Sequence, residues 1–261
     1  MPLQTTEAIV IGGKNLGEAD RIVAFYTKEK GKVRAVAEGA RRIRSRFSGS
    51  LELFAYGRLV YFERPNRTLH RINEFALMEP FRALREDLDL FVHGSYLLEL
   101  IEVSMEEGEA NEELFSLLFS ALRLLNTGQE PAALHRAFEI RLLPEIKWCV
   151  LCRTSPEKFV GAVRETPLQL SPSQGGLLCP SCRPEVRDGL PVSLSSLAFL
   201  RQALQVELHL LNPAGLSPAQ KEELKEILQA CLLYFLGRTL RTVDFLGRLN
   251  LGVGGWGLGV R

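Results

Sequence analysis

The spacing of apolar residues changes at Pro80, and this change limits the folds open to the 261-residue chain. Before Pro80, short apolar runs are separated by Gly- and Pro-containing turns, which is typical of strands. Residues 32–39 alternate, so that Val33, Ala35 and Ala37 are expected on one face. After Pro80, apolar residues recur at helical spacing. We therefore expect a multidomain α+β protein in which strands precede helices.

Five strands are expected before residue 80, with glycine-rich corners and no convincing helix between them. Their predicted ranges are 7–13, 20–27, 32–39, 51–63 and 69–79. Strands this short, packed into so few residues, favour a small antiparallel barrel. The oligonucleotide-binding (OB) barrel is one such fold.

The helical part shows clear starting signals. Pro80 precedes a helix that is expected to run through Phe91, and Asn111 is a good N-cap for the next helix. Pro131 suits the first turn of a third helix, which Pro144 should end. Residues 80–147 are therefore expected to form a helical bundle. Two later helices are expected to begin at Ser193 or Ser195 and at Ser217-Pro218, and to pack on that bundle.

Four of the five cysteines form two Cys-x-x-Cys pairs separated by 26 residues. They are Cys149, Cys152, Cys179 and Cys182. Two such pairs can close a tetrahedron of thiolates around Zn²⁺, and the residues between them are expected to include a hairpin. A redox dithiol and an inert set of thiols are the alternatives. Because four thiolates fill the coordination shell, one structural zinc ion is expected. The fifth cysteine, Cys231, lies on the apolar stripe of a predicted helix and is expected to be a buried, unreactive thiol.

A short segment concentrates positive charge in a chain whose net charge is only +1. Residues 39–49, GARRIRSRFSG, contain Arg41, Arg42, Arg44 and Arg46, and no acid occurs between Glu38 and Glu52. Lys32 and Arg34 are expected to extend this positive surface along the preceding strand. Guanidinium groups match phosphate oxygens, so the pattern favours nucleic acid, with an anionic protein or a solvated loop as alternatives.

The remaining charges are unevenly distributed. Residues 1–75 hold 14 Lys/Arg and 8 Asp/Glu, whereas residues 76–148 hold 6 and 14. The acidic stretch 102–113 is expected to be a solvated connection between helices, which could repel nucleic acid or meet a basic partner. Phe47, Tyr56 and Phe62 could stack on bases but are expected in the core.

No catalytic constellation is apparent, so we expect a protein that is not an enzyme. The four histidines are scattered, and there is no nucleophile elbow or Walker loop. The Gly-rich tail 251–261 lacks the strand and helix that a phosphate loop requires, and it is expected to be loose. No apolar run is long enough to span a membrane and no secretory signal is present, so a cytoplasmic, nucleoid-associated protein is expected.

Three motifs resemble the RecO family of bacterial recombination mediators. They are E-x-D-R-I at Glu18 to Ile22, T-x-x-x-G-K-x-x-x-x-A-x-G-A-R at Thr27 to Arg41, and S-R-F-x-x-x-L-E-x-F at Ser45 to Phe54. LHRINEF resembles the family's last barrel strand, and YFLGRTLRTVDFL resembles its closing helix. The resemblance implies an OB barrel, a helical domain and an embedded four-cysteine zinc module.

The resemblance also implies a function in DNA repair and homologous recombination. It implies binding of single- and double-stranded DNA, annealing of complementary strands, and work with RecR. It further implies contact with the C-terminal tail of single-stranded DNA-binding protein. Through this contact, the family assists the loading of RecA on DNA that this protein covers. Carried over by position, the expected DNA contacts are Lys32, Arg34, Arg41, Arg42, Arg44 and Arg46. Arg21 is expected to pair structurally with Asp20, and Arg238 or Arg241 could clamp the tail's carboxylate.

Five regions are predicted, and one other function class competes. The OB domain spans 1–79, the helical bundle 80–147, the zinc module 148–190, the C-terminal helices 191–250 and the tail 251–261. The competing class is a zinc-ribbon regulator that binds RNA or a protein and does not anneal DNA.

Overall fold

The computed structural model describes most of the chain and groups it into two compact units. The described residues are 2–65, 67–143, 149, 151–153, 168–211, 216–243 and 245. One unit comprises residues 1–129 and the other residues 130–261. The first helices therefore group with the barrel, which differs from the predicted grouping of residues 80–147 into one bundle.

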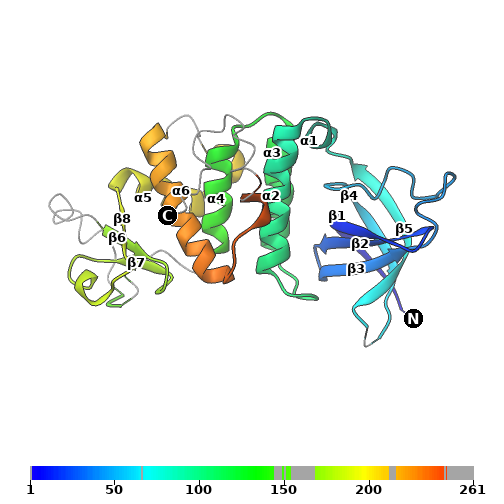
Figure 1. Cartoon of the computed structure of the whole chain (residues 1–261), viewed down its shortest axis with the longest axis horizontal. Coiled ribbons are helices and arrows are strands. Elements are labelled where there is room, and N and C mark those ends of the chain that lie inside the picture. The colour runs from blue at the N-terminus through cyan, green and yellow to red at the C-terminus, as the bar shows by residue number, and fades with distance from the viewer. Residues whose placement is uncertain are drawn as a thin grey trace. The chain divides into compact units, whose positions relative to one another are not determined.

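The first unit contains the expected barrel, which closes in the strand order β1-β2-β3-β5-β4 (Figure 1). Its strands are β1 (Leu3–Leu16), β2 (Asp20–Thr27), β3 (Gly31–Ala37), β4 (Tyr56–Phe62) and β5 (Leu69–Glu79). All neighbouring pairs are antiparallel except β3 and β5, which run parallel. This five-stranded closure confirms an OB-like barrel.

Alternation in the sequence places every second side chain inside the barrel. Val33, Ala35 and Ala37 lie in its core, as the pattern predicted, together with Phe25 and Phe75, whose ring centroids are 5.5 Å apart. Each buried aromatic side chain contributes about 1.5–3 kcal/mol through removal of apolar area from water. The core is thus set by period-2 patterning.

The fourth strand is shorter than predicted. Residues 51–55 do not extend it, because Phe54 adopts φ 72° and its N–H donates to Val10 O at 3.0 Å. Phe47 and Leu51 are buried in the barrel core. The segment that follows the arginines therefore packs into the barrel rather than continuing the sheet.

Three helices complete the first unit: α1 (Arg82–Glu86), α2 (Leu88–Ser104) and α3 (Glu112–Asn126). The predicted single helix through Phe91 is broken at Asp87, whose carboxylate accepts from Asp89 N and Leu90 N. Leu88 is consequently 58% exposed. Asn111 caps α3 as expected, accepting from Leu114 N at 2.9 Å.

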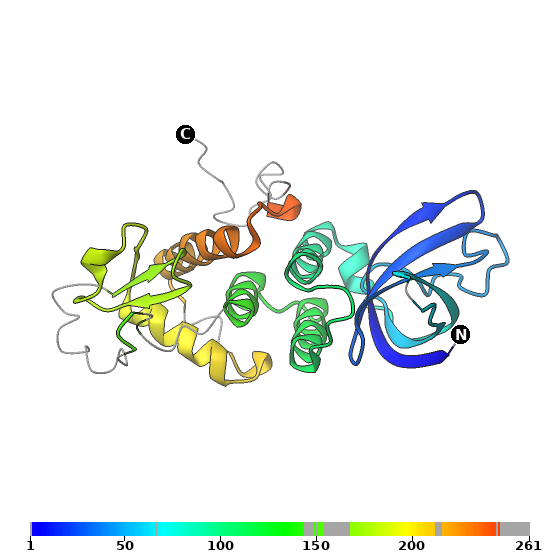
Figure 2. The ribbon, with the colours of Figure 1, turned by 90° about the horizontal axis from the view of Figure 1, so that it is seen from below.

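The second unit combines helices with a small sheet (Figure 2). Its helices are α4 (Pro131–Leu142), α5 (Leu194–Gln205) and α6 (Pro218–Leu236), and its strands are β6 (Leu168–Ser171), β7 (Gly176–Leu178) and β8 (Leu190–Val192). The strand order is β7-β6-β8. Ser193 caps α5, and Ser217 forms a capping box on α6. These capping bonds satisfy N–H groups that would otherwise lack partners.

Several predicted features fall on residues that the structure does not describe. They are the stop at Pro144, Trp148 and Val150 beside the first cysteine, residues 161–167 of the expected hairpin and the tail 251–261. The described helices include none that is both long and apolar enough to cross a bilayer.

Candidate nucleic-acid interface and metal centre

The segment with four arginines, Arg41, Arg42, Arg44 and Arg46, leaves the end of β3 and is fixed to the turn between β1 and β2. We call these four residues the arginine segment. The N–H of Gly39 donates to Asp20 Oδ1 at 2.8 Å, and the N–H of Arg41 donates to Ala19 O at 2.9 Å. The base of the segment is thus held by the barrel, while all four arginines are exposed.

The guanidinium groups of the arginine segment face carbonyl oxygens and solvent rather than carboxylates. Arg41 Nη1 donates to Gly17 O at 2.8 Å, and Arg46 Nη2 donates to Ile72 O at 3.4 Å. Arg46 also lies 4.7 Å from the ring centroid of Phe47. Within the described residues none of the four forms an ion pair, so their positive charge is uncompensated.

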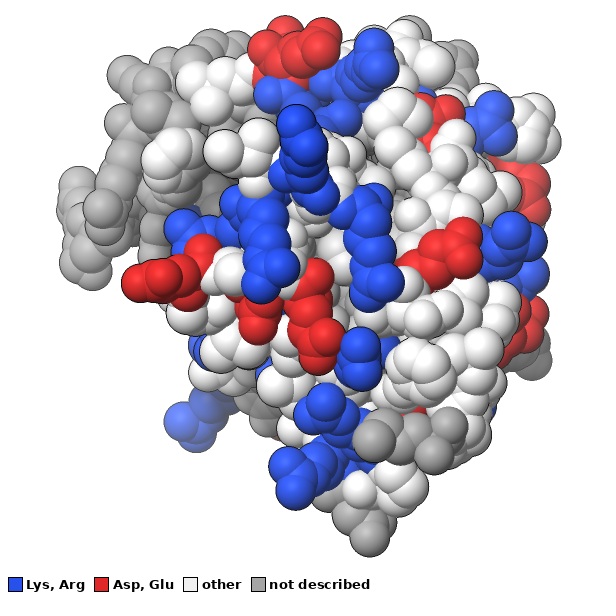
Figure 3. Space-filling model, turned by 90° about the vertical axis from the view of Figure 1, so that its right-hand side faces the viewer, with Lys and Arg blue, Asp and Glu red and all other residues white. Residues whose placement is uncertain are grey.

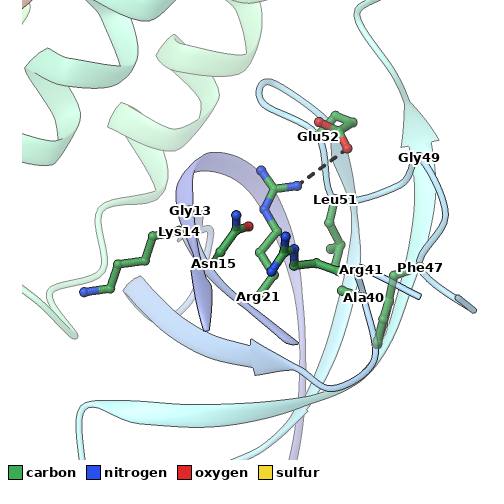
Figure 4. Close-up of a pocket in the computed structure, with 10 residues that line it drawn as sticks. All are labelled: Gly13, Lys14, Asn15, Arg21, Ala40, Arg41, Phe47, Gly49, Leu51 and Glu52. Carbon is green, nitrogen blue, oxygen red and sulfur yellow. Dashed lines mark ion pairs between the residues drawn. The ribbon is translucent and has the colours of Figure 1, made fainter. Parts of the chain in front are cut away.

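A polar pocket of about 360 Å³ opens between the arginine segment and the strands β1 and β2 (Figure 4). Lys14, Asn15, Arg21 and Arg41 contribute donors to its lining. The only acid in the lining is Glu52, which lies 3.5 Å from Arg21 Nη1. Such a surplus of cationic donors suits an anionic group such as a phosphate. Arg21 pairs with Glu52, while Asp20 accepts from the backbone.

Lys32 and Arg34 lie in a different environment on β3. Arg34 Nη1 is 2.8 Å from Glu107 Oε1, and Arg34 Nη2 is 3.9 Å from Glu102. Lys32 Nζ donates to the backbone oxygen of Glu102 at 2.7 Å. The stretch that was expected to be solvated therefore meets a basic partner within its own unit.

Backbone contacts fix this acidic stretch against the strand. The N–H of Gly108 donates to Lys32 O at 3.3 Å, and Glu107 forms an isolated parallel bridge with Lys32. Gly31 has φ 61°, and a Cβ there would lie 2.2 Å from Glu109 O. Only glycine allows so close an approach. We call residues 102–109 the acidic clamp.

The aromatic residues of the barrel are mostly in the core. Phe47 and Tyr56 are 4% and 9% exposed, and the ring centroids of Tyr56 and Phe119 are 4.5 Å apart. Phe62 is half-buried, with the Arg71 guanidinium 6.0 Å from its ring centroid. The expectation of core positions is thus met by Phe47 and Tyr56, whereas Phe62 keeps an accessible part.

The four cysteines meet in the second unit, and their sulfur atoms all lie within 4.8 Å of one another. Cys149 bridges to Leu177 in β7, and Cys179 follows that strand directly, so the sheet brings the two pairs together. The Sγ atoms of Cys152 and Cys179 are 3.7 Å apart. A zinc tetrahedron with Zn–S bonds of ~2.3 Å has sulfur–sulfur edges of ~3.8 Å. The donor set therefore fits a metal ion.

Burial also affects the protonation of the cysteine thiols. Burial raises the pKa of the Cys179 and Cys182 thiols, and both thiols lie in hydrogen-bonding contact with the other cysteines of the group. A bound divalent cation removes that cost, because coordination deprotonates a thiol outright. Cys231 lies apart from this group, is 4% exposed and has a pKa raised to about 12 by burial. It is a buried thiol, as expected.

A second pocket of about 290 Å³ lies in the second unit and is mainly apolar. Leu143, Leu170, Cys231, Tyr234 and Phe235 contribute to its lining. Tyr234 is 60% and Phe235 is 47% exposed. The predicted clamp residues Arg238 and Arg241 follow the end of α6 and are exposed.

Comparisons with known proteins agree with this arrangement. The family model described as Recombination protein O N terminal matches residues 1–81, and the model described as Recombination protein O C terminal matches residues 85–244. The chain belongs to the RecO family. The boundary between the two matches falls where the barrel gives way to helices.

Curated relatives of the RecO family align over almost the whole chain. A protein named DNA repair protein RecO from Symbiobacterium thermophilum is 34% identical over 96% of this chain and 99% of its own length. Relatives of the same name from Desulforamulus reducens and Roseiflexus sp. are 33% and 36% identical, over 97% and 92% of this chain. They cover 99% and 84% of their own lengths.

Sequence reasoning located the arginine segment and the cysteines but missed two features of the surface. Lys14 and Asn15 line the polar pocket because the hairpin of β1 and β2 brings them to the arginines. Arg64 and Arg67 lie in the turn between β4 and β5, which the sequence marked only as a turn. Lys14 and Arg41 line one pocket because the folded barrel brings β1 and the arginine segment together.

Proposed function

We propose that this RecO-family chain acts in DNA repair and homologous recombination by binding DNA and annealing complementary single strands. The supporting observation is the arginine segment: four exposed guanidinium groups on an OB-like barrel, without a carboxylate partner among the described residues. Guanidinium forks bind phosphate oxygens in two-point geometry. The bound partner is the DNA backbone, single- or double-stranded, in the nucleoid of the cytoplasm.

The mechanism is electrostatic rather than catalytic. Two DNA strands repel one another through their phosphates, and arginines that neutralise some of those phosphates lower the repulsion that opposes pairing. Backbone contacts do not read base sequence, so binding is largely independent of sequence. Four neutralised phosphates on a single strand give a slope of about −3 for log affinity against log salt.

The six predicted DNA contacts do not contribute equally in this proposal. Arg41, Arg42, Arg44 and Arg46 supply most of the affinity, with Lys14 and Arg21 at the pocket beside them. Lys32 and Arg34 contribute less, because the acidic clamp already binds both side chains: Lys32 donates to the Glu102 backbone and Arg34 pairs with Glu107. A phosphate would have to replace Glu107 to reach Arg34.

The metal in the proposal is one structural Zn²⁺ held by Cys149, Cys152, Cys179 and Cys182. Zinc suits four sulfur ligands in a tetrahedron, and a filled shell leaves no position for a substrate. When bound, the ion cross-links the two cysteine pairs and so stabilises the fold of the second unit.

The partners in the proposal are RecR, the C-terminal tail of single-stranded DNA-binding protein and, indirectly, RecA. The apolar pocket between α6 and the β6–β7 hairpin offers a docking place for apolar residues of that acidic tail. Arg238 or Arg241, just beyond α6, would then bind a carboxylate. By this route the chain assists RecA loading on covered DNA.

An annealing assay tests the proposal against a zinc-ribbon regulator that binds RNA or protein only. Two complementary labelled oligonucleotides are coated with single-stranded DNA-binding protein and mixed, with and without the chain. Faster pairing supports the mediator function. Unchanged pairing at low salt contradicts it, and retention of RNA or a protein in its place identifies the regulator.

A further inference from the structure

The hairpin between β4 and β5 carries a second group of cations. Arg64 and Arg67 lie on either side of its turn, and we call them the hairpin arginines. Arg67 is exposed and Arg64 half-buried. Neither forms an ion pair with an acid in the part of the chain that the structure describes. Their charge is therefore available to an external anion, as it is in the arginine segment.

Hydrogen bonds hold this hairpin to the barrel. The N–H of Arg64 donates to His70 Nδ1 at 3.1 Å, and the N–H of Glu63 donates to Pro2 O at 3.0 Å. Gln4 Nε2 donates to Glu63 Oε2 at 2.7 Å, which engages the carboxylate that precedes Arg64 in the chain. A backbone fixed in this way loses little conformational entropy when its side chains bind a ligand.

Both cationic groups lie near the first half of β5 without belonging to it. Arg46 Nη2 donates to the carbonyl oxygen of Ile72, and Arg67 precedes Ile72 by five residues. Five residues span at most about 17 Å. The grooves of duplex DNA separate its two backbones by about 6 and 12 Å. The spacing therefore allows the barrel to contact two strands of one forming duplex.

Acidic side chains separate the two groups of cations. Glu38 Oε2 lies 3.1 Å from Arg71 Nη2, so this ion pair stands between the start of the arginine segment and the β4–β5 hairpin. On the face that shows the barrel, Lys and Arg side chains form separate groups with Asp and Glu between them (Figure 3). A single backbone crossing both groups would pass these acids, whereas two backbones need not.

We propose that the hairpin arginines bind the phosphate backbone of a second DNA strand while the arginine segment holds the first. This inference rests on the proposed annealing function and assigns it a second site on the same barrel. Holding both strands on one protein makes their encounter intramolecular, which raises their effective concentration. The hairpin thus serves pairing rather than the capture of a lone strand.

The test changes both hairpin arginines together, Arg64→Ala with Arg67→Ala. For a single oligonucleotide of about six nucleotides, which one OB barrel can cover, the affinity is expected to stay within about twofold. The acceleration of annealing is expected to fall at least about 10-fold, because the second strand is no longer held. For duplex DNA, losing two phosphate contacts flattens the log–log salt slope by about 1.8.

A matched control removes the same charge elsewhere on the barrel. Lys28→Ala with Lys30→Ala alters the turn between β2 and β3, which contains no residue of either cationic group. Equal losses in the two double variants, with unchanged melting temperatures, would show a net-charge effect only and overturn the inference. Full annealing by the hairpin variant would overturn it as well.

The failure of the proposed function has a different signature. If the unaltered chain does not accelerate annealing, the proposed function is wrong, whichever variant is compared. The duplex salt slope then still decides whether the hairpin arginines touch a second backbone. An unchanged slope in the hairpin variant excludes that contact.

Discussion

The arginine segment and the positive face of β3 look alike in sequence but differ in the folded barrel. The cations of β3, Lys32 and Arg34, are followed closely in the chain by the arginine segment. In sequence, each region resembles a phosphate-binding surface. The arginine segment has no carboxylate partner among the described residues. On β3, by contrast, Arg34 contacts Glu107 at 2.8 Å and Lys32 donates to the Glu102 backbone.

The difference shows that local charge in a sequence does not fix the potential at a surface. A carboxylate within 4 Å offsets a guanidinium by about 1 kcal/mol in water and by more where water is excluded. The acidic clamp supplies such groups from roughly 70 residues away in the chain, as the bond from Lys32 to Glu102 shows. Among the described residues, only one of the two positive regions therefore lacks carboxylate partners.

Removing the arginine segment should have the largest effect on DNA affinity. Changing Arg41, Arg42, Arg44 and Arg46 together to Ala should weaken single-strand binding on the order of 100-fold, or about 3 kcal/mol. The log–log salt slope should become flatter by about 2.8 as four phosphate contacts are lost. Fluorescence titration at several salt concentrations measures both quantities.

A charge-preserving variant shows whether the loss is electrostatic. Replacing the same four arginines by Lys should keep most of the salt slope, because ammonium groups also neutralise phosphates, and should lower affinity only through the lost forks. The melting temperature should barely change in either variant, because the side chains are exposed. A binding defect that accompanies unfolding would contradict the assignment.

Opening the acidic clamp should have a smaller effect, in the opposite direction. Glu102→Gln with Glu107→Gln removes both carboxylates that pair with Arg34. The affinity for single-stranded DNA should therefore rise about threefold, and the slope of log affinity against log salt should steepen by about 0.7. Isothermal titration measures the affinity. Glu106→Gln with Glu113→Gln changes net charge equally without touching Arg34. An equal rise in both double variants would mean that net charge alone is responsible.

Much of this molecule follows from its sequence, and the parts that do not share one cause. The barrel was predictable because alternation such as Val33, Ala35 and Ala37 is local, and the cysteine group because two pairs can close only one tetrahedron. The αL conformation of Phe54 depends on packing against β1. The pairing of Arg34 with Glu107 likewise requires distant segments to meet, which periodicity does not reveal.

The helical part shows the same limit. Asn111, Ser193 and Ser217 cap helices as predicted, because capping is local chemistry. The break at Asp87 was missed, although Asp is itself a good capping residue, because the apolar spacing of Leu84 and Leu88 continues across it. Where two local signals compete, tertiary packing decides between them.

Removing the β3 cations should change DNA affinity only slightly. Lys32→Ala with Arg34→Ala should weaken single-strand binding about twofold or less, since both groups are already engaged. The same change should lower the free energy of unfolding by about 1 kcal/mol, because the clamp loses a partly exposed ion pair and a hydrogen bond. Urea unfolding measures the stability. A loss of affinity as large as that of the arginine segment would break the distinction between the two regions.

The metal centre should affect DNA affinity least, because it belongs to the other unit. Cys149→Ser removes one of four sulfur ligands, so bound metal should fall to below about one tenth of an equivalent and the melting temperature should drop, since metal binding contributes directly to folding. DNA affinity, measured below the new melting temperature, should stay within about twofold, because the four arginines remain in place. Cys231→Ser is the matched control, since that thiol lies outside the cluster and its change should leave the metal content intact. If Cys149→Ser instead abolished DNA binding while the barrel remained folded, the binding surface could not be confined to the first unit.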